Sequence, residues 1–268
     1  GEVARQKRQR QQLLAEWQQQ KAPRAEGGNR AGGQEPPDDA LWEPCPAIAE
    51  QQPLPGVAVP QAPLPSNGKW RDVASAPLEW FDAEKRYRCF ALAPAFLTQD
   101  DMNAIHVAAK HRSVAEINDR KGYLAFKHRV WRFELQLRSL CPRLYTRLMD
   151  LMRRVDGEKW RRLRKKSKKV YPEIEYIEYD VAVQGEPCFI EPHVDNKSAV
   201  TMVAMLSEPG AYIGGASCFR RADGRRGHRE HVLQQGDIVL FRGEKLTHWI
   251  TPVTAGRRVI LQIELSRV

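Results

Sequence analysis

The chain has 268 residues and a formal net charge of +10, so its length allows one large domain or two small ones. It has no run of 18 or more apolar residues, and we therefore expect no membrane span. Residues 151–170 carry ten Lys or Arg against two acidic residues, whereas residues 171–268 carry eleven basic and thirteen acidic ones. The positive charge of residues 151–170 favours an acidic partner for that segment. Residues 171–268 have no excess of basic residues, so the charge does not indicate that they bind nucleic acid.

The cysteines are few and scattered. There are five of them and no C-x-x-C pair, which argues against a disulfide framework and favours a reducing intracellular compartment. The first residue is glycine and not methionine, as in a precursor that has lost a targeting segment. The sequence therefore leaves the cytoplasm, the nucleus and an organelle interior open.

The N-terminal quarter has the composition of a tail. Residues 1–22 are rich in Gln and Arg, and nine prolines follow between residues 36 and 65. Such a segment buries little apolar surface and is extended or disordered when free. We expect residues 1–75 to form a long low-complexity tail, and a large protein assembly is the partner that would order it.

The globular domain is expected over residues 76–268. An apolar and aromatic run, "LEWFDAEKRYRCFALAPAFL", predicts an opening strand, and Thr98 is then a good N-cap for a helix. A second helical region is expected over roughly residues 130–166, with a break at Pro142. We expect these helices to support the sheets from residues 98–168, and the basic end of this region is most simply a solvated face.

After Tyr171 the sequence changes to short β-rich runs separated by Gly, Pro and charged turns. Their number and spacing predict an antiparallel jelly roll over residues 171–268, in an α+β arrangement with the helices against one sheet. The runs are "EIEYIEYDVAV", "CFIEPHVD", "AVTMVAMLS", "GGASCFRR", "REHVLQ", "DIVLFRG", "THWITPV" and "RRVILQIEL".

The stretch "EPHVDN" places His193 and Asp195 two residues apart, so that on an extended strand both side chains point to one side. His248 stands 53 residues further on, near the start of the seventh run. Two histidines and one carboxylate bind one face of a metal and leave the opposite positions open, which favours non-heme Fe(II). Zinc is the rival, but structural zinc prefers four filled positions and usually cysteine.

These motifs resemble the prolyl 4-hydroxylase-like branch of the Fe(II)/2-oxoglutarate-dependent dioxygenases over about a hundred residues. The resemblance is carried by H-x-D, by "YIGGASCFRR" and by "QQGDIVLFRGEKLTHWITPVTAGRR". It implies a double-stranded β-helix in which His193, Asp195 and His248 hold Fe(II). It also implies that 2-oxoglutarate chelates the iron and pairs with Arg258, or with Arg257 if the register slips by one residue.

The chain departs from the family at one position. Many relatives carry a tyrosine nine residues before the first metal histidine, where it contacts the co-substrate, and this chain has Gln184. Tyr179 and Thr201 lie on neighbouring predicted strands and are the other candidates for that contact.

The resemblance implies an oxidoreductase that uses O2 to hydroxylate a protein side chain, prolyl or similar, through hydrogen abstraction by a ferryl species. No acid or base side chain is needed for this chemistry, so none is assigned. The alternative is a structural subunit that keeps the dioxygenase fold and docks through its tail. Nucleic-acid demethylation is disfavoured, because the branch that performs it usually has a second arginine where this chain has Glu264.

Three further residues have simpler interpretations. His228 and His231 lie in "GHREHV", a basic turn-to-strand region, and we expect both to face solvent. Trp249 follows His248 and points to the other face of its strand, where it is most simply part of the core.

Overall fold

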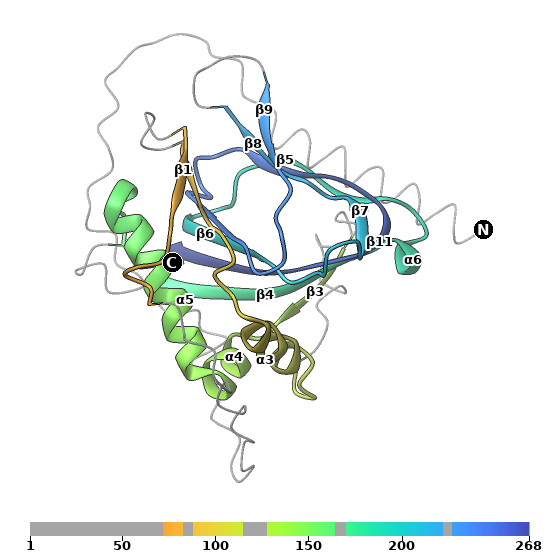
Figure 1. Cartoon of the computed structure of the whole chain (residues 1–268), viewed down its shortest axis with the longest axis horizontal. Helices are drawn as coiled ribbons and strands as arrows, with labels where there is room; N and C mark the ends of the chain where they lie inside the picture. The colour runs from red at the N-terminus through yellow and green to blue at the C-terminus, as the bar shows by residue number, and fades with distance from the viewer. Residues whose placement is uncertain (1–71, 83–87, 115–127, 164–169, 222–226, 268) are drawn as a thin grey trace.

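The computed structural model describes most of the chain after residue 71, and Figure 1 draws its course. The described ranges are 72–82, 88–114, 128–163, 170–221 and 227–267. The predicted tail lies outside them except for its last four residues, and so does the basic run 164–169. No helix within the described ranges is long and apolar enough to cross a membrane.

The larger of two β-sheets has the strand order β1-β2-β10-β6-β11-β4-β3, and all neighbours are antiparallel. Its long central strands, β4, β6 and β11, lie side by side in Figure 1. The strands are β1 Glu79–Phe81, β2 Phe90–Ala93, β3 Arg129–Arg132, β4 Val170–Asp180, β6 Ser198–Met205, β10 Ile238–Phe241 and β11 His248–Arg267.

The smaller sheet faces the larger one and contains β5 Cys188–His193, β7 Tyr212–Gly214, β8 Ser217–Arg220 and β9 His228–His231. β5, β7 and β8 pair with the first half of β11, and β9 pairs with β8. A buried apolar cluster that includes Phe90, Tyr179, Val203 and Phe219 fills the space between the sheets. The predicted jelly roll, or double-stranded β-helix, is therefore the fold of this domain.

The C-terminal strand differs from the prediction. The runs "THWITPV" and "RRVILQIEL" were expected to be two separate strands, but β11 is one strand of 20 residues. Gly256 has φ +76°, and a Cβ there would lie 2.1 Å from the backbone oxygen of Ala211. The glycine lets the strand bend without ending, so that β11 passes from the smaller sheet to the larger one.

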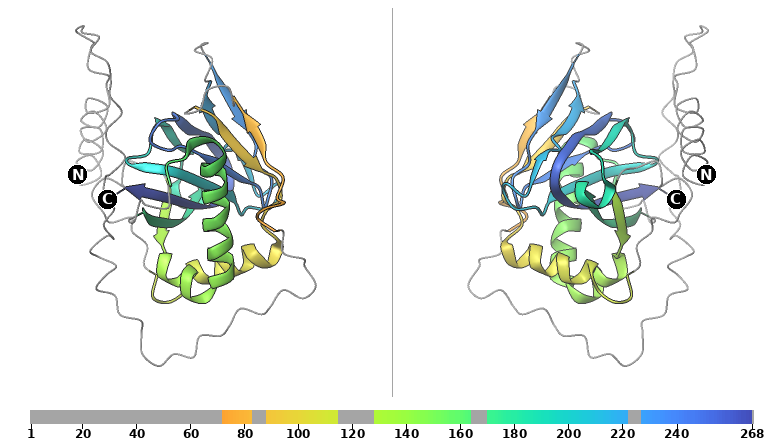
Figure 2. Two further views of the ribbon diagram at one scale, coloured as in Figure 1. Left: turned by 90° about the vertical axis from the view of Figure 1, so that its left-hand side faces the viewer. Right: turned by 90° about the vertical axis from the view of Figure 1, so that its right-hand side faces the viewer.

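Helices α3 Gln99–Ala109, α4 Glu134–Leu140 and α5 Pro142–Val155 cover the outer face of the larger sheet (Figures 1 and 2). A buried cluster that includes Ile105, Leu148 and Ile263 joins the helices to the sheet. The predicted start of the first helix is confirmed: the Thr98 hydroxyl accepts a hydrogen bond from the Asp101 N–H, and the Asp101 carboxylate accepts one from the Thr98 N–H.

The second helical region begins later than predicted. Residues 129–132 form strand β3, which pairs with β4, and Val130 is buried between the sheets. Pro142 is the first residue of α5. An N–H at this position has no hydrogen-bond partner within the helix, so a proline, which lacks the N–H, is tolerated there. The expected break at this proline is thus present, but the helical support consists of residues 99–109 and 134–160 and is interrupted by a strand.

Candidate metal centre

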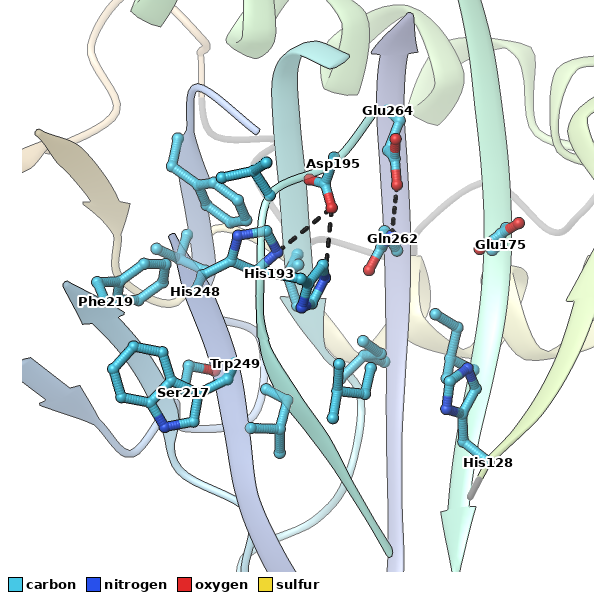
Figure 3. A pocket seen from close by; sticks show the side chains of 18 of the residues that line it. His128, Glu175, His193, Asp195, Ser217, Phe219, His248, Trp249, Gln262 and Glu264 are labelled. Carbon is cyan, nitrogen blue, oxygen red and sulfur yellow. Dashed lines mark hydrogen bonds and ion pairs between the residues drawn. The ribbon is translucent and has the colours of Figure 1, made fainter. Parts of the chain in front are cut away.

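Three side chains converge between the two sheets, as Figure 3 shows. His193 ends β5, Asp195 lies just after it, and His248 begins β11 directly opposite His193 in the strand pairing. Their nearest ligand atoms all lie within 4.8 Å of one another. Asp195 Oδ1 is 3.5 Å from Nε2 of His193 and 3.4 Å from Nε2 of His248. The structure therefore brings the three predicted metal ligands together.

Backbone carbonyls fix the orientation of both imidazole rings. Nδ1 of His193 lies 2.8 Å from the Glu191 carbonyl, and Nδ1 of His248 lies 3.0 Å from the Leu246 carbonyl. A carbonyl only accepts hydrogen bonds, so each Nδ1 carries the proton. In the neutral ring the lone pair is then on Nε2, the atom that faces Asp195, and this is the arrangement of a metal-binding histidine.

Asp195 is held as a carboxylate. Burial alone would raise its pKa, but the adjacent His248 and His193 side chains outweigh burial and lower the pKa below its usual range. The Thr201 hydroxyl donates a 2.6 Å hydrogen bond to Oδ2 and leaves Oδ1 facing the imidazoles. A Cβ at Gly243 would come within 2.4 Å of Oδ2, so glycine makes room for this carboxylate.

Replacing Thr201 with valine is expected to weaken divalent-metal binding about 10–100-fold, because the carboxylate loses the partner that orients it. Thr201 is fully buried, and valine has nearly its shape. Isothermal titration of the wild type, Thr201→Val and Thr201→Ser with a divalent metal measures the effect. Wild-type affinity in the valine variant would contradict the assigned role, and serine is expected to restore most of the affinity.

A cavity of about 590 Å³ opens beside the three side chains. Much of its wall is apolar and comes from both sheets, including Ile177, Ile190, Val203, Phe219, Phe241 and Ile250. A concave, largely apolar site with a few convergent polar groups is the usual form of a small-molecule site.

Arg258 lies fully buried next to the wall of this cavity. Its Nη2 is 3.4 Å from the Ser217 hydroxyl, and its guanidinium lies over the Tyr179 ring, 5.2 Å from the centroid. Ser217 and Tyr179 both line the cavity. Nε and Nη1 have no hydrogen-bond partner among the described residues. A buried guanidinium without a carboxylate partner is costly, so this position fits an anionic ligand.

The structure also distinguishes the two candidate arginines. Arg257 points away from the cavity and pairs with Glu178, and its side chain is 42% exposed. The glycine pair of "YIGGAS" explains how Arg258 fits, because a Cβ at Gly215 would lie 2.8 Å from Arg258 Cδ. Arg258 is thus the arginine that the strand directs inward.

The other predicted co-substrate residues have different surroundings. Tyr179 lies opposite Arg258 on β4, and burial raises the pKa of its hydroxyl to about 12, so it is neutral. Thr201 contacts Asp195 and does not line the cavity. Gln184 ends the short helix α6, Val181–Gln184, and is not among the cavity residues either. Of these three predicted co-substrate residues, the structure therefore places only Tyr179 beside the Arg258 guanidinium.

One side of the cavity is acidic. Glu173 and Glu175 on β4 face it, and so does Glu264 on β11, directly opposite Glu173 in the strand pairing. Burial raises the pKa of Glu175 to about 7, and burial together with the nearby carboxylates raises that of Glu264 well above its usual range. Arg132 lies beside Glu175 at 3.4 Å, but no Lys or Arg lines the cavity among the residues that the structure describes.

The raised pKa of Glu175 predicts a pH-dependent cost in stability. The pKa of Glu175 is about 7 in the folded protein and 4.5 ordinarily, so the protonated form is favoured by folding. The contribution of this group to the free energy of unfolding is therefore fully present below pH 4.5 and is lost as the pH rises through 7. In the metal-free protein, Glu175→Gln is expected to raise the Tm relative to the wild type at pH 8 and much less at pH 5. The exposed Glu208→Gln is the control, and an equal difference at both pH values would contradict the assignment.

Sequence reasoning missed His128, which lies just before β3 and lines the cavity. Burial, and then the nearby His193, lower the pKa of His128 to about 3, so the ring is neutral, and it lies 5.2 Å from the Tyr179 ring. No local motif marks this residue, because β3 reaches the site only through its pairing with β4.

Two simpler interpretations need correction. His231 was expected to face solvent, but it is half-buried, with its ring 4.4 Å from that of Phe81. Trp249 is half-buried rather than core, and its ring lies 4.9 Å from that of His228. Phe81 and Phe90 of the larger sheet cover His231, whereas Trp249 packs against the exposed ring of His228. His228 is exposed, as expected.

Comparison with solved structures finds proteins that share this fold. A prolyl-4-hydroxylase from Pseudomonas putida matches 70% of this chain and 100% of its own, with 16% identity and a TM-score of 0.50. An oxidoreductase of the 2OG-Fe(II) oxygenase family from Burkholderia pseudomallei matches 67% of this chain and 86% of its own, with 15% identity and a TM-score of 0.46. No protein-family model and no curated protein matches the sequence.

The likeness to the Pseudomonas enzyme shows a shared fold that covers the whole of that enzyme. The fold is the one that the motif resemblance implied. At 16% identity the activity does not follow from the fold, so function has to be argued from the site.

Proposed function

We propose that this chain is a 2-oxoglutarate- and Fe(II)-dependent oxygenase that hydroxylates a side chain of a protein substrate. One observation carries the proposal: a His-Asp-His set and a buried arginine, which has no carboxylate partner among the described residues, adjoin the same cavity of a fold shared with a prolyl-4-hydroxylase. The resemblance of the motifs to that branch supports the same conclusion.

The donor set fits iron. Two imidazoles and one carboxylate, which lie on one side of a common centre, are the ligand types of non-heme Fe(II) sites with open positions. His193 and His248 would bind through Nε2, and Asp195 through the Oδ1 atom that faces them. No described cysteine belongs to this set, which argues against structural zinc.

The arginine fits 2-oxoglutarate. A dicarboxylate that binds the metal with one end needs a cation for the other, and Arg258 offers Nε and Nη1. Ser217 and Tyr179 lie beside the guanidinium and are neutral donors for the same carboxylate. Co-substrate binding would thereby supply the missing partner of a buried charge.

When bound, iron and 2-oxoglutarate would activate O2, so that one oxygen atom enters a C–H bond of the substrate and the other enters succinate, with release of CO2. The protein holds and orients the reactants. Thr201 fixes Asp195, backbone carbonyls fix both imidazoles, and the apolar wall excludes water from the reacting groups. No side chain of the chain has to transfer a proton for this chemistry.

The resemblance favours a prolyl or similar side chain as the substrate, and the acidic wall favours a second candidate. Glu173, Glu175 and Glu264 would attract a positively charged side chain such as lysine or arginine, and a bound cation would favour their ionised forms. We propose a basic side chain as the second candidate.

Succinate formation tests the reaction. The purified chain is supplied with Fe(II), O2 and 2-oxoglutarate, with and without a peptide library that contains prolyl and lysyl targets. Succinate that depends on iron, together with a peptide heavier by one oxygen atom, is the expected result. An absence of succinate under every condition would contradict the proposal.

Two matched peptides that differ only in a proline or a lysine at the target position separate the substrate candidates. If the acidic wall sets the choice, Glu264→Gln lowers turnover of the lysyl peptide at least ~10-fold, the effect of losing a charged hydrogen bond, and leaves the prolyl peptide unchanged. Equal effects on both peptides would exclude a charge preference.

The alternative function, a structural subunit, depends on the N-terminal tail and not on the site. It predicts that removing residues 1–75 abolishes binding to a large assembly and leaves succinate formation intact. If the truncated chain still joins its assembly, or if no assembly is found with the full chain, the alternative fails.

A further inference from the structure

A second group of metal-binding side chains lies on the β8–β9 hairpin. Cys218 on β8 and Glu230 on β9 are direct partners in the strand pairing, and His228 lies two residues before Glu230 on the same face. The cysteine sulfur, a histidine nitrogen and a glutamate oxygen all lie within 4.8 Å of one another.

This group is separate from the cavity. On β8, Ser217 and Phe219 line the cavity, and Cys218 between them faces the other side of the strand. Trp249, the partner of Cys218 on β11, also lines the cavity, and its ring lies 4.9 Å from that of His228. The three potential ligands therefore lie on the outer face of the smaller sheet, with an indole on one side.

We infer that Cys218, His228 and Glu230 bind one zinc ion. Zinc accepts sulfur, imidazole and carboxylate ligands, and with three protein ligands it keeps one position for water or another ligand. The ion would replace the present 2.9 Å contact between His228 Nε2 and Glu230 Oε1. Both of these side chains are exposed, so they can close on the ion without moving the backbone.

The surroundings of Cys218 agree with this assignment. Its thiol is buried, and its hydrogen bond to the Ala216 carbonyl is long at 3.8 Å. A thiol binds zinc as the thiolate, so its proton leaves when the metal binds. Zinc would displace this proton, tie β9 to β8 and hold the strand whose opposite face carries Ser217 and Phe219.

Cobalt is the probe, because thiolate ligands give bound Co2+ an intense near-ultraviolet charge-transfer band that His and Asp ligands do not give. The full chain, freed of metal with a chelator, is titrated with Co2+ under reducing conditions. The expected result is a band that saturates as Co2+ is added and disappears when Zn2+ is added; saturation at one ion per chain is expected in His193→Ala, which lacks the other metal centre. The band is expected to persist in His193→Ala, so the test does not depend on the proposed oxygenase reaction.

Substitutions show whether the Co2+ band comes from the Cys218 site or from another cysteine. Cys218→Ser is expected to abolish the band, and His228→Ala and Glu230→Gln to weaken Co2+ binding at least ~10-fold. Because the latter two side chains are exposed, these variants keep the test valid even if Cys218→Ser fails to fold. Cys141→Ser is the control and keeps the band. A wild type without the band, or a band unchanged in both His228→Ala and Glu230→Gln, would overturn the inference.

Discussion

Replacing His193 with alanine is expected to abolish iron-dependent succinate formation and to weaken Fe(II) binding more than ~100-fold, because even the loss of a residue that only orients a ligand costs 10–100-fold. The substitution leaves Asp195 and His248 without the third ligand of their set. Anaerobic Fe(II) titration and a succinate assay measure the two effects. The side chain is partly accessible, so the fold is expected to survive.

The matched control is His111→Ala, which changes a histidine in the turn after α3 that does not line the cavity. This variant is expected to retain wild-type iron binding and activity. Full activity in His193→Ala would show that the His-Asp-His set is not the metal centre, and the oxygenase assignment would then fail.

Replacing Arg258 with methionine is expected to raise the KM for 2-oxoglutarate at least ~10–100-fold, since a hydrogen bond to a charged group contributes about 1.5–3 kcal/mol. The same change removes a fully buried guanidinium, two of whose nitrogens have no hydrogen-bond partner in the described part of the chain, and inserts an apolar chain of similar length. In the absence of co-substrate, the Tm of Arg258→Met is therefore expected to equal or exceed that of the wild type. Arg258 would then be a residue that binds a ligand and not one that stabilises the fold.

Arg257→Met, on the same strand, is the control for this prediction. It loses its pair with the buried Glu178, which keeps Arg129 at 3.6 Å, and is expected to leave the KM for 2-oxoglutarate unchanged. If Arg257→Met raised this KM and Arg258→Met did not, the inward arginine would have been assigned incorrectly.

The local features of the fold were predictable because their causes are local. Thr98 and Asp101 form a capping box that is visible in the sequence, and His193 and Asp195 share a side of the chain through the two-residue period of a strand. His248 was predictable as the partner of this pair only because the motif around it resembles a known family.

The features that were missed depend on pairing between distant segments. Residues 129–132 have a pattern that suits a helix, and they form a strand because β4 offers a free edge to pair with. The role of Thr201 follows from its 2.6 Å approach to Asp195, which no periodicity predicts. The acidic wall arises from the register that places Glu264 opposite Glu173, two residues far apart in the sequence.

The most direct test of the central claim is anaerobic titration of the purified chain with Fe(II) and then 2-oxoglutarate. The readout is the weak visible charge-transfer band that a 2-oxoacid gives when it chelates ferrous iron. We expect the band in the wild type, none in His193→Ala, and a much higher 2-oxoglutarate requirement in Arg258→Met. Iron binding without this band in the wild type would contradict the assignment of a 2-oxoglutarate-dependent oxygenase.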